Sequence, residues 1–334
     1  MANNSKVLIA PLNWGLGHAT RCIPLIERYE QDGWEVIIAS NGESLTFLKT
    51  SFPHLEFHQL PGYNVKYSRD GSMVLAIVNQ LPKLWNVILE EYKWTKRFVK
   101  SCPVDLIISD NRYGVRHKKV KSIALTHQVW VKSPVFEEML NRFNHRMLNR
   151  FDECWIPDEE GEDNLTGELS SPAINIPKRF IGTLSTVRSL TEVEKDIPIL
   201  ALLSGPEPQR TILQTELKPY LSAIEGAILV KGMVEAAGLY TQDGLTIIEH
   251  VNREELQDLL TRSRVVICRS GYSSIMDIEQ AKIPAILIPT PGQTEQEYLA
   301  ARLSSRPGYQ VILQHELNEE RFLKALRLAD PRPV

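Results

Sequence analysis

The sequence predicts an α/β protein made of two domains, each a parallel sheet with helices on its faces. Short apolar runs alternate with amphipathic helical stretches along the chain, which is the pattern of βαβ units. The length of 334 residues fits two domains of ordinary size. A polar stretch at 185–195 separates two such alternating sets. We therefore expect an N-terminal domain at 1–184 and a C-terminal domain at 185–334.

The N-terminal set begins with an apolar run at 7–10 that leads into the loop Gly15-Leu16-Gly17-His18. A helix follows and stops near Gly33, and the next apolar run, at 35–39, completes a βαβ unit. Further strands are predicted at 55–59, 105–109, 122–126, 153–156 and 179–182, and helices at 72–100 and 134–151.

The C-terminal set has two strands that end in polar turns containing glycine. The run 265–268 stops at Arg269-Ser270-Gly271, and the run 285–288 stops before Gly292. In a parallel sheet such turns lie at the carboxyl ends of the strands, where ligands bind and where helix N-termini favour a diphosphate. The other predicted strands are 199–203, 227–230, 246–250 and 309–313, and the helices are 208–222, 253–262, 273–281, 294–304 and 318–327.

Composition narrows the class of protein further. The chain is 43% hydrophobic and 24% charged, as a soluble globular protein is, and its net charge of −3 argues against a general nucleic-acid binder. Its four cysteines are scattered without a C-x-x-C pair, so we expect neither structural zinc nor disulfides, and a cytoplasmic location. We also expect no signal peptide and no membrane span, because no run of about 18 apolar residues occurs.

The G-L-G-H loop near the N-terminus and the R-S-G…D segment near the C-terminus, in this order, resemble glycosyltransferase family 28, the family of the peptidoglycan N-acetylglucosaminyltransferase. The resemblance implies the GT-B fold, in which two Rossmann-like domains face a cleft. It further implies a metal-independent, inverting transfer of a sugar from a UDP-sugar donor, with N-acetylglucosamine as the best guess. No cofactor is expected.

His18 and Asp110 are the candidate catalytic residues. An imidazole accepts protons near neutral pH, so His18 would act as general base towards an acceptor hydroxyl. Asp110 ends a predicted strand and would share the sheet edge with His18, where a carboxylate orients an imidazole. The alternatives are a histidine that only binds loop backbone, and an Asx turn at Asp110.

The resemblance places the donor nucleotide at several loops. Gly15 and Gly17 would let the first loop approach the donor, and Ser204, Gly205 and Arg210 would face its diphosphate. This second loop departs from the family, because Pro206 and Glu207 stand where glycines are common. A plain structural turn is the alternative there.

The R-S-G segment and the helix after it would hold the rest of the donor. Arg269, Ser270, Gly271 and Ser273 would bind phosphate or sugar, with Arg269 or Arg210 offsetting the diphosphate charge. Asp277 would bind the ribose hydroxyls, as acidic residues do in dinucleotide sites; an exposed helix aspartate is the alternative.

The donor's sugar and base would be recognised at two other places. Glu295 and Gln296 stand where the family reads the sugar, but Glu297 replaces a usual carboxamide, so the identity of the sugar does not carry over. His250 and Val251 end a predicted strand that reads uracil through its backbone in the family.

The acceptor would dock on the N-terminal domain and is a small molecule, a glycan or a lipid-linked sugar. His127 and Gln128 stand where the family has a loop below the acceptor site, and a solvated loop is the alternative. The helices at 72–100 and 134–151 carry apolar and basic residues. This pattern fits peripheral contact with the inner face of a membrane, and equally an ordinary core-facing helix with a solvated basic side.

Three other functions are alternatives to a glycosyltransferase. A nucleotide-sugar hydrolase would use water in place of the acceptor, because a related family has a similar G-x-G-H loop. A UDP-sugar sensor would bind the donor without turnover. A nicotinamide dehydrogenase is disfavoured, because G-L-G-H lacks the third glycine of G-x-G-x-x-G and Ser40-Asn41 follow the second strand instead of an acidic residue.

Overall fold

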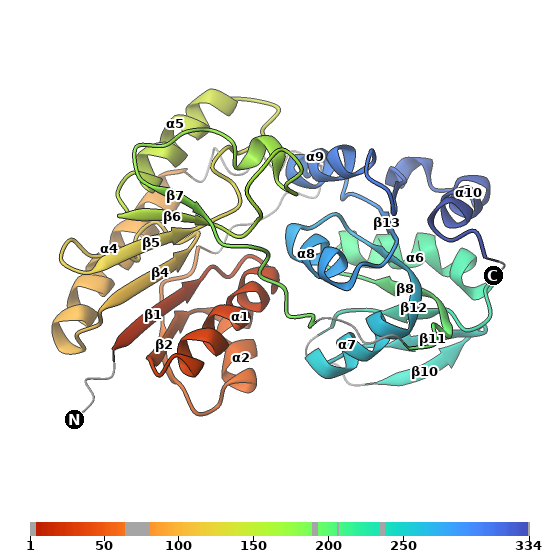
Figure 1. Cartoon of the computed structure of the whole chain (residues 1–334), viewed down its shortest axis with the longest axis horizontal. Helices are drawn as coiled ribbons and strands as arrows, with labels where there is room; N and C mark the ends of the chain where they lie inside the picture. The colour runs from red at the N-terminus through yellow and green to blue at the C-terminus, as the bar shows by residue number, and fades with distance from the viewer. Residues whose placement is uncertain (1–4, 64–80, 189–192, 206, 234–237, 333–334) are drawn as a thin grey trace. The chain divides into compact units, whose positions relative to one another are not determined.

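The chain forms two compact units, Met1–Leu184 and Ser185–Val334. The computed structural model describes residues 5–63, 81–188, 193–205, 207–233 and 238–332 (Figure 1). Each unit is a mainly parallel sheet with crossover helices, which confirms the predicted α/β class.

The N-terminal unit holds a sheet in the order β3-β2-β1-β4-β5-β6-β7, and all its neighbours pair in parallel. Its strands are β1 (Lys6–Pro11), β2 (Glu35–Ser40), β3 (Glu56–Gln59), β4 (Leu106–Asp110), β5 (Lys121–Leu125), β6 (Glu153–Ile156) and β7 (Lys178–Phe180). Its α-helices are α1 (Gly17–Gln31), α2 (Gly42–Ser51), α4 (Leu81–Ser101) and α5 (Glu137–Leu148).

The central strands of this sheet are buried because helices pack against them. Leu8 and Ala10 belong to a core that the side chains of Trp94 and Phe98 on α4 complete. Helix α1 contacts β1 and β2 and buries its own apolar side, including Ile26. Residues 72–80 of the predicted helix 72–100 lie outside the described residues.

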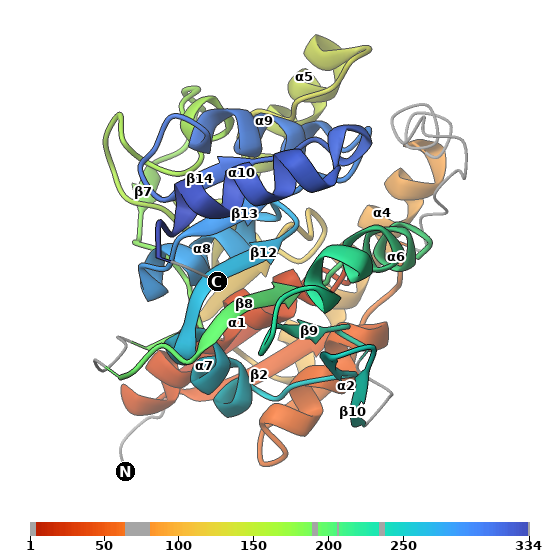
Figure 2. The same ribbon diagram turned by 90° about the vertical axis from the view of Figure 1, so that its right-hand side faces the viewer.

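The C-terminal unit repeats this plan in the order β10-β11-β9-β8-β12-β13-β14. Its strands are β8 (Ile197–Leu202), β9 (Ile228–Val230), β10 (Leu239–Gln242), β11 (Leu245–Ile248), β12 (Ser263–Cys268), β13 (Ala285–Leu287) and β14 (Tyr309–Val311). Its α-helices are α6 (Gln209–Ser222), α7 (Arg253–Arg262), α8 (Tyr272–Ala281), α9 (Thr294–Leu303) and α10 (Glu319–Ala329). Helix α10 lies along β13 and β14 (Figure 2).

The prediction of purely parallel sheets is wrong at one edge strand, β10. It pairs antiparallel with β11 through a turn at Asp243 and Gly244, whose φ angles are 53° and 79°. Positive φ at both positions is the requirement of a tight hairpin turn, for which Asp-Gly is a strong sequence signal. Helix α2 is a second element that the sequence analysis did not include.

Both sheets share one topological feature that decides where a ligand binds. In the N-terminal sheet, β1 to β3 follow one another outward on one side, and β4 to β7 follow one another outward on the other side. In the C-terminal sheet, the corresponding central neighbours are β8 and β12. Ligands of such doubly wound sheets bind beyond the carboxyl ends of the strands at this switch point. In this chain the switch points lie between β1 and β4 and between β8 and β12.

Candidate active site

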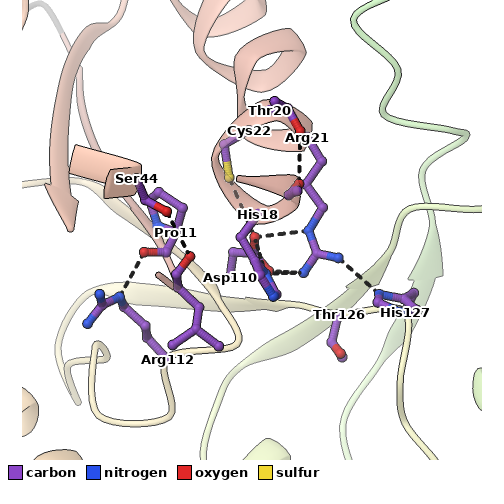
Figure 3. A network of polar contacts seen from close by, with 12 residues as sticks. Pro11, His18, Thr20, Arg21, Cys22, Ser44, Asp110, Arg112, Thr126 and His127 are labelled. Carbon is purple, nitrogen blue, oxygen red and sulfur yellow. Dashed lines mark hydrogen bonds and ion pairs between the residues drawn. The ribbon is translucent and has the colours of Figure 1, made fainter. Parts of the chain in front are cut away.

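The switch point of the N-terminal unit brings together the two predicted catalytic residues. His18 is the second residue of α1, which follows β1, and Asp110 is the last residue of β4. The His18 Nδ1 lies 3.1 Å from the Asp110 Oδ2 (Figure 3). The carboxylate of Asp110 is fully buried and bonds to side chains of α1, so the Asx-turn alternative is wrong.

A third residue, Arg21, joins this pair and was not predicted. It lies three positions after His18, on the same side of the helix. Its Nε donates to the Asp110 Oδ2 at 2.9 Å and its Nη2 donates to the Oδ1, which makes the bidentate contact typical of arginine and carboxylate. The Arg21 Nη1 lies 2.9 Å from the Nδ1 of His127, and Figure 3 shows the guanidinium between Asp110 and His127. The spacing of His18 and Arg21 was the only signal in the sequence.

The charges of this cluster hold each group in a defined protonation state. Burial alone would raise the pKa of Asp110, but the charges of Arg21 and His18 and their hydrogen bonds lower it well below its usual range. Burial lowers the pKa of His18, as do Arg21 and His127, while Asp110 acts in the opposite direction. A carboxylate that stays ionised and an imidazole that stays neutral are what a general base and its orienting partner need.

A second buried charge pair supports the start of the glycine loop. The carbonyl of Pro11, at the end of β1, accepts 2.8 Å hydrogen bonds from the Ser40 hydroxyl and from Arg112 Nε. Arg112 in turn pairs with Glu91 of α4 at 2.8 Å, and both side chains are fully buried. This pair was not predicted from the sequence, because its members come from separate elements.

The predicted acceptor loop after β5 is anchored in the structure. His127 is only 5% exposed and its ring reaches Arg21, so the solvated-loop alternative is wrong for this residue. Gln128 donates its N–H to the Thr126 hydroxyl at 3.0 Å, and its carbonyl accepts from Asn144 of α5 at 3.0 Å.

The loop predicted to face the diphosphate with Ser204, Gly205 and Arg210 follows β8 at the switch point of the C-terminal unit. Ser204 and Gly205 are exposed there, and Gly205 has a φ of 94°, which favours glycine. Arg210 is partnered within its own unit, because its Nη1 donates to the Gly232 carbonyl at 3.0 Å and its Nε to Glu207 at 2.9 Å.

The structure contradicts the predicted role of Arg269, which was to offset the charge of the diphosphate. Its side chain is buried, with 1% exposure, and it donates to the carbonyls of Ile288, Pro289 and Gln209 at 2.9–3.2 Å. The Ser270 hydroxyl is also buried and donates to the Gln296 carbonyl at 2.8 Å. Both side chains therefore build the turn after β12 and do not reach outward from it.

Helix α8 begins directly after this turn. Gly271 is the N-cap of α8, and a Cβ placed there would meet only the Gln296 Nε2, at 4.0 Å. Ser273 lies in the first turn of the helix. Such a helix start offers backbone N–H groups to an anion.

Asp277 lies further along α8 and is partnered by the segment that opens the C-terminal unit. Its Oδ1 accepts from the Ser185 hydroxyl at 2.5 Å. Burial raises the pKa of Asp277 to about 6, against hydrogen bonds from Ser185 and Thr186 that favour the charged form. The alternative of an exposed helix aspartate is therefore wrong.

The residues predicted to read the donor's sugar and base lie in two other loops. The Gln296 Oε1 accepts from the Thr290 N–H at 2.9 Å, so its amide oxygen holds the loop after β13. Glu295 lies in the first turn of α9. His250 and Val251 follow the end of β11 and are half-buried.

Two features of the described part of the chain bear on partners. Within it, no group of three or more His, Cys, Asp or Glu side chains has the arrangement that would hold a metal ion. Among the helices of the described ranges, none combines the length and apolar character that crossing a membrane requires.

Comparison with known proteins gives similarity of sequence over the whole chain. The profile of the "Glycosyltransferase family 28 C-terminal domain" matches residues 240–332. The UDP-N-acetylglucosamine–N-acetylmuramyl-(pentapeptide) pyrophosphoryl-undecaprenol N-acetylglucosamine transferase of Histophilus somni is 23% identical, over 99% of this chain and 91% of the relative. An uncharacterised glycosyltransferase of Methanopyrus kandleri is 22% identical over 89% of each chain.

Solved structures show the same fold. The glycosyltransferase of kitacinnamycin covers 98% of this chain and 91% of its own length with a TM-score of 0.68 at 12% identity. MurG of Acinetobacter baumannii covers 98% and 94% with a TM-score of 0.57 at 14% identity. Fold and sequence similarity together define a glycosyltransferase of the GT-B class. Within that class, the chain is related to glycosyltransferase family 28.

Proposed function

We propose that the protein is an inverting transferase that moves a sugar from a UDP-sugar to an acceptor hydroxyl. The contact between His18 and Asp110 at the switch point carries this proposal. His18 would remove the proton of the acceptor hydroxyl as its oxygen attacks the anomeric carbon. The bond from that carbon to the diphosphate breaks in the same step, so UDP leaves and the configuration inverts. Asp110 would stabilise the imidazolium that forms.

The C-terminal unit would bind the donor. The N-terminus of α8 at Gly271 and Ser273 would receive the diphosphate, together with Ser204 and Gly205 after β8, because the backbone N–H groups at a helix start and the helix dipole favour a negative charge. Asp277 would bind the ribose. We assign no phosphate contact to Arg269, whose guanidinium is buried and donates from both terminal nitrogens to acceptors of its own unit.

His250, Val251, Glu295 and Gln296 would contact the base and the sugar in this proposal. N-acetylglucosamine is the first donor sugar to test, because several relatives, including that of Histophilus somni, are named for transfer from UDP-N-acetylglucosamine.

A lipid-linked acceptor at the inner face of a membrane is the acceptor class that we propose. The name of the Histophilus somni relative specifies a pyrophosphoryl-undecaprenol acceptor. At the start of α5, Phe136 and Met139 are 56% and 47% exposed, and Arg142 lies on the same helix. Apolar side chains beside a cation suit an anionic lipid surface.

The deciding experiment measures product formation from UDP-N-acetylglucosamine with and without a polyprenyl-pyrophosphoryl sugar. Glycosylated lipid and UDP in equal amounts would support the transferase. Free sugar without acceptor would identify the hydrolase, and binding without any turnover would identify the sensor.

Nucleotide preference is measured separately by thermal unfolding. UDP at about 100 times its dissociation constant should stabilise the protein by about 2.7 kcal/mol. ADP and GDP should stabilise it less at the same concentration. A larger shift with GDP would contradict the uridine assignment.

A further inference from the structure

The Nδ1 atom of His18 has two neighbours that cannot both bind it at once. The Arg21 Nη2 lies 2.9 Å away and the Asp110 Oδ2 lies 3.1 Å away. A guanidinium only donates hydrogen bonds, and an ionised carboxylate only accepts them. Since Nδ1 of a neutral imidazole carries either a proton or a lone pair, each contact requires a different tautomer.

The two tautomers differ in their value as a base. With the proton on Nδ1, His18 donates to Asp110 and presents the lone pair of Nε2 to a hydroxyl. With the lone pair on Nδ1, His18 accepts from Arg21, and the proton on Nε2 prevents that atom from accepting another. The position of the Arg21 guanidinium therefore bears directly on whether the base is competent.

We propose that Arg21 is a positioning residue that keeps the His18 imidazole neutral in the resting site and, through its contact with Nδ1, favours the tautomer with the proton on Nε2. The inference rests on the proposed role of His18 as base. Arg21 does not touch the reacting atoms in this proposal and acts through His18 and Asp110 alone.

Charge balance around His18 gives the physical reason. The groups that face it are Asp110 from β4, Arg21 from α1 and His127 from the loop after β5. The Cys22 thiol of α1 lies against the Asp110 carboxylate, 3.8 Å from its Oδ2. The Asp110 carboxylate is already neutralised by the bidentate contact of Arg21, so it attracts a proton onto His18 less than a bare carboxylate would. The Arg21 Nη1 donor beside His127 Nδ1 also requires a lone pair on that atom.

The test is a ¹⁵N NMR titration of the histidines in the free protein, which needs no substrate. Arg21→Met should raise the pKa of His18 by about one to two units, because the carboxylate then stabilises the imidazolium unopposed. The neutral imidazole of this variant should carry its proton on Nδ1. Arg21→Lys keeps the charge and should leave the pKa close to that of the wild type. Arg28→Met, the same change at an exposed position of α1, is the matched control and should have no effect.

Activity gives the second readout. The acid limb of kcat/KM against pH should move to higher pH in Arg21→Met by the same amount as the His18 pKa. An arginine with only a structural role would lower the rate at every pH without moving the limb. An unchanged His18 pKa in Arg21→Met would overturn the proposal. A shifted His18 pKa in a protein without transferase activity would instead keep the role of Arg21 and remove the proposed function.

A further comparison applies if Arg21→Met does not fold, because that change leaves the buried Asp110 unpaired. The double variant Arg21→Met/Asp110→Asn has no buried charge without a partner. Its His18 pKa should exceed that of Asp110→Asn alone, in which the Arg21 charge remains. Equal values in these two variants would also overturn the proposal.

Discussion

The hydroxyl of Ser185, the first residue of the C-terminal unit, donates a 2.5 Å hydrogen bond to the Oδ1 of Asp277 on α8. The same hydroxyl oxygen accepts from the Val187 N–H at 3.0 Å, and the Val187 side chain is buried. The start of the predicted linker, residues 185–195, is thus packed onto the proposed ribose site. A ribose diol that approaches Asp277 would meet a carboxylate that already accepts hydrogen bonds from the Ser185 hydroxyl and the Thr186 backbone.

Nucleotide affinity should therefore respond in opposite directions to two substitutions. Asp277→Ala removes the charge-assisted bonds to ribose and should weaken UDP binding by about 1.5–3 kcal/mol. Ser185→Ala removes the hydroxyl that competes with ribose for the Oδ1 and should tighten UDP binding severalfold. Calorimetric titration with UDP measures both, with the exposed Ser305→Ala as control. UDP affinity within twofold of wild type in Asp277→Ala would remove Asp277 from the ribose site.

The affinity for UDP should also depend on pH through Asp277. Burial raises the pKa of this carboxyl to about 6, so it is protonated in the free protein below that pH and ionised above it. Only the ionised form accepts two strong hydrogen bonds from a diol, so affinity should rise as pH increases from 5 to 7 and then level off. Asp277→Asn should lack this rise. A wild-type affinity that is flat over this range would contradict the assignment.

The raised pKa of Asp277 also predicts that the free energy of unfolding falls as pH rises, whereas UDP affinity increases. A carboxyl whose pKa is higher in the folded than in the unfolded protein stabilises the fold most when protonated, and this contribution is lost as pH rises through about 6. The free energy of unfolding of the wild type, relative to Asp277→Asn, should therefore fall between pH 4 and pH 7. Urea unfolding at several pH values measures this difference.

The buried strands could be predicted because their sequences are continuous apolar runs bounded by turns. The prediction at 35–39 corresponds to Glu35–Ser40, and that at 265–268 to Ser263–Cys268. Strand β10 was missed because all four of its residues are exposed, so it has no apolar run. The Asp243-Gly244 turn before β11 was the available signal.

The polar core of the site was harder to predict than its position. The strand ends located His18 and Asp110, because parallel strands bring their carboxyl ends to one edge. Burial of a charged side chain depends on partners distant in sequence, as with Arg112 and Pro11, which are 101 positions apart. For Arg269 the prediction was wrong in the other direction. This cation in a ligand-binding turn was predicted to face the ligand, but it donates to carbonyl groups of its own unit.

Arg269 should accordingly matter for stability. Arg269→Met leaves the buried carbonyls of Ile288 and Pro289, the part-buried Gln209 carbonyl and the Gln314 amide oxygen without this donor. It should destabilise the protein by about 3 kcal/mol or more. Arg327→Met, at an exposed position of α10, should change the free energy of unfolding by no more than about 0.5 kcal/mol. Chemical denaturation compares the two. A stable Arg269→Met protein with weakened UDP binding would restore the phosphate role.

The pair of Glu91 and Arg112 should hold the N-terminal unit together behind the glycine loop. Glu91→Gln leaves the fully buried Arg112 without its counter-charge and should cost about 3–5 kcal/mol. The exposed neighbour Glu90→Gln is the control. The double variant Glu91→Gln/Arg112→Met should recover part of the loss, because no buried charge is then left unpaired. A double variant less stable than the sum of the single changes would contradict this explanation.

Turnover should separate the roles of His18 and Asp110. His18→Ala removes the proposed base and should lower kcat by roughly 10²–10⁴-fold. UDP affinity should stay nearly unchanged, because the nucleotide contacts are proposed in the C-terminal unit. His54→Ala, an exposed histidine of the same unit, should leave kcat unaltered.

Asp110→Asn should reduce turnover less than His18→Ala, since it leaves the imidazole in place. It should, however, destabilise the protein by about 3–5 kcal/mol, because Arg21 then stays buried without a carboxylate. Assays must therefore be run below the lowest melting temperature of the set. The combined His18→Ala/Asp110→Asn variant should have nearly the kcat of His18→Ala, because residues that act as one unit are not additive. Additive losses would separate the two residues while keeping His18 as the base, whereas near-normal turnover in His18→Ala would remove the histidine from the mechanism.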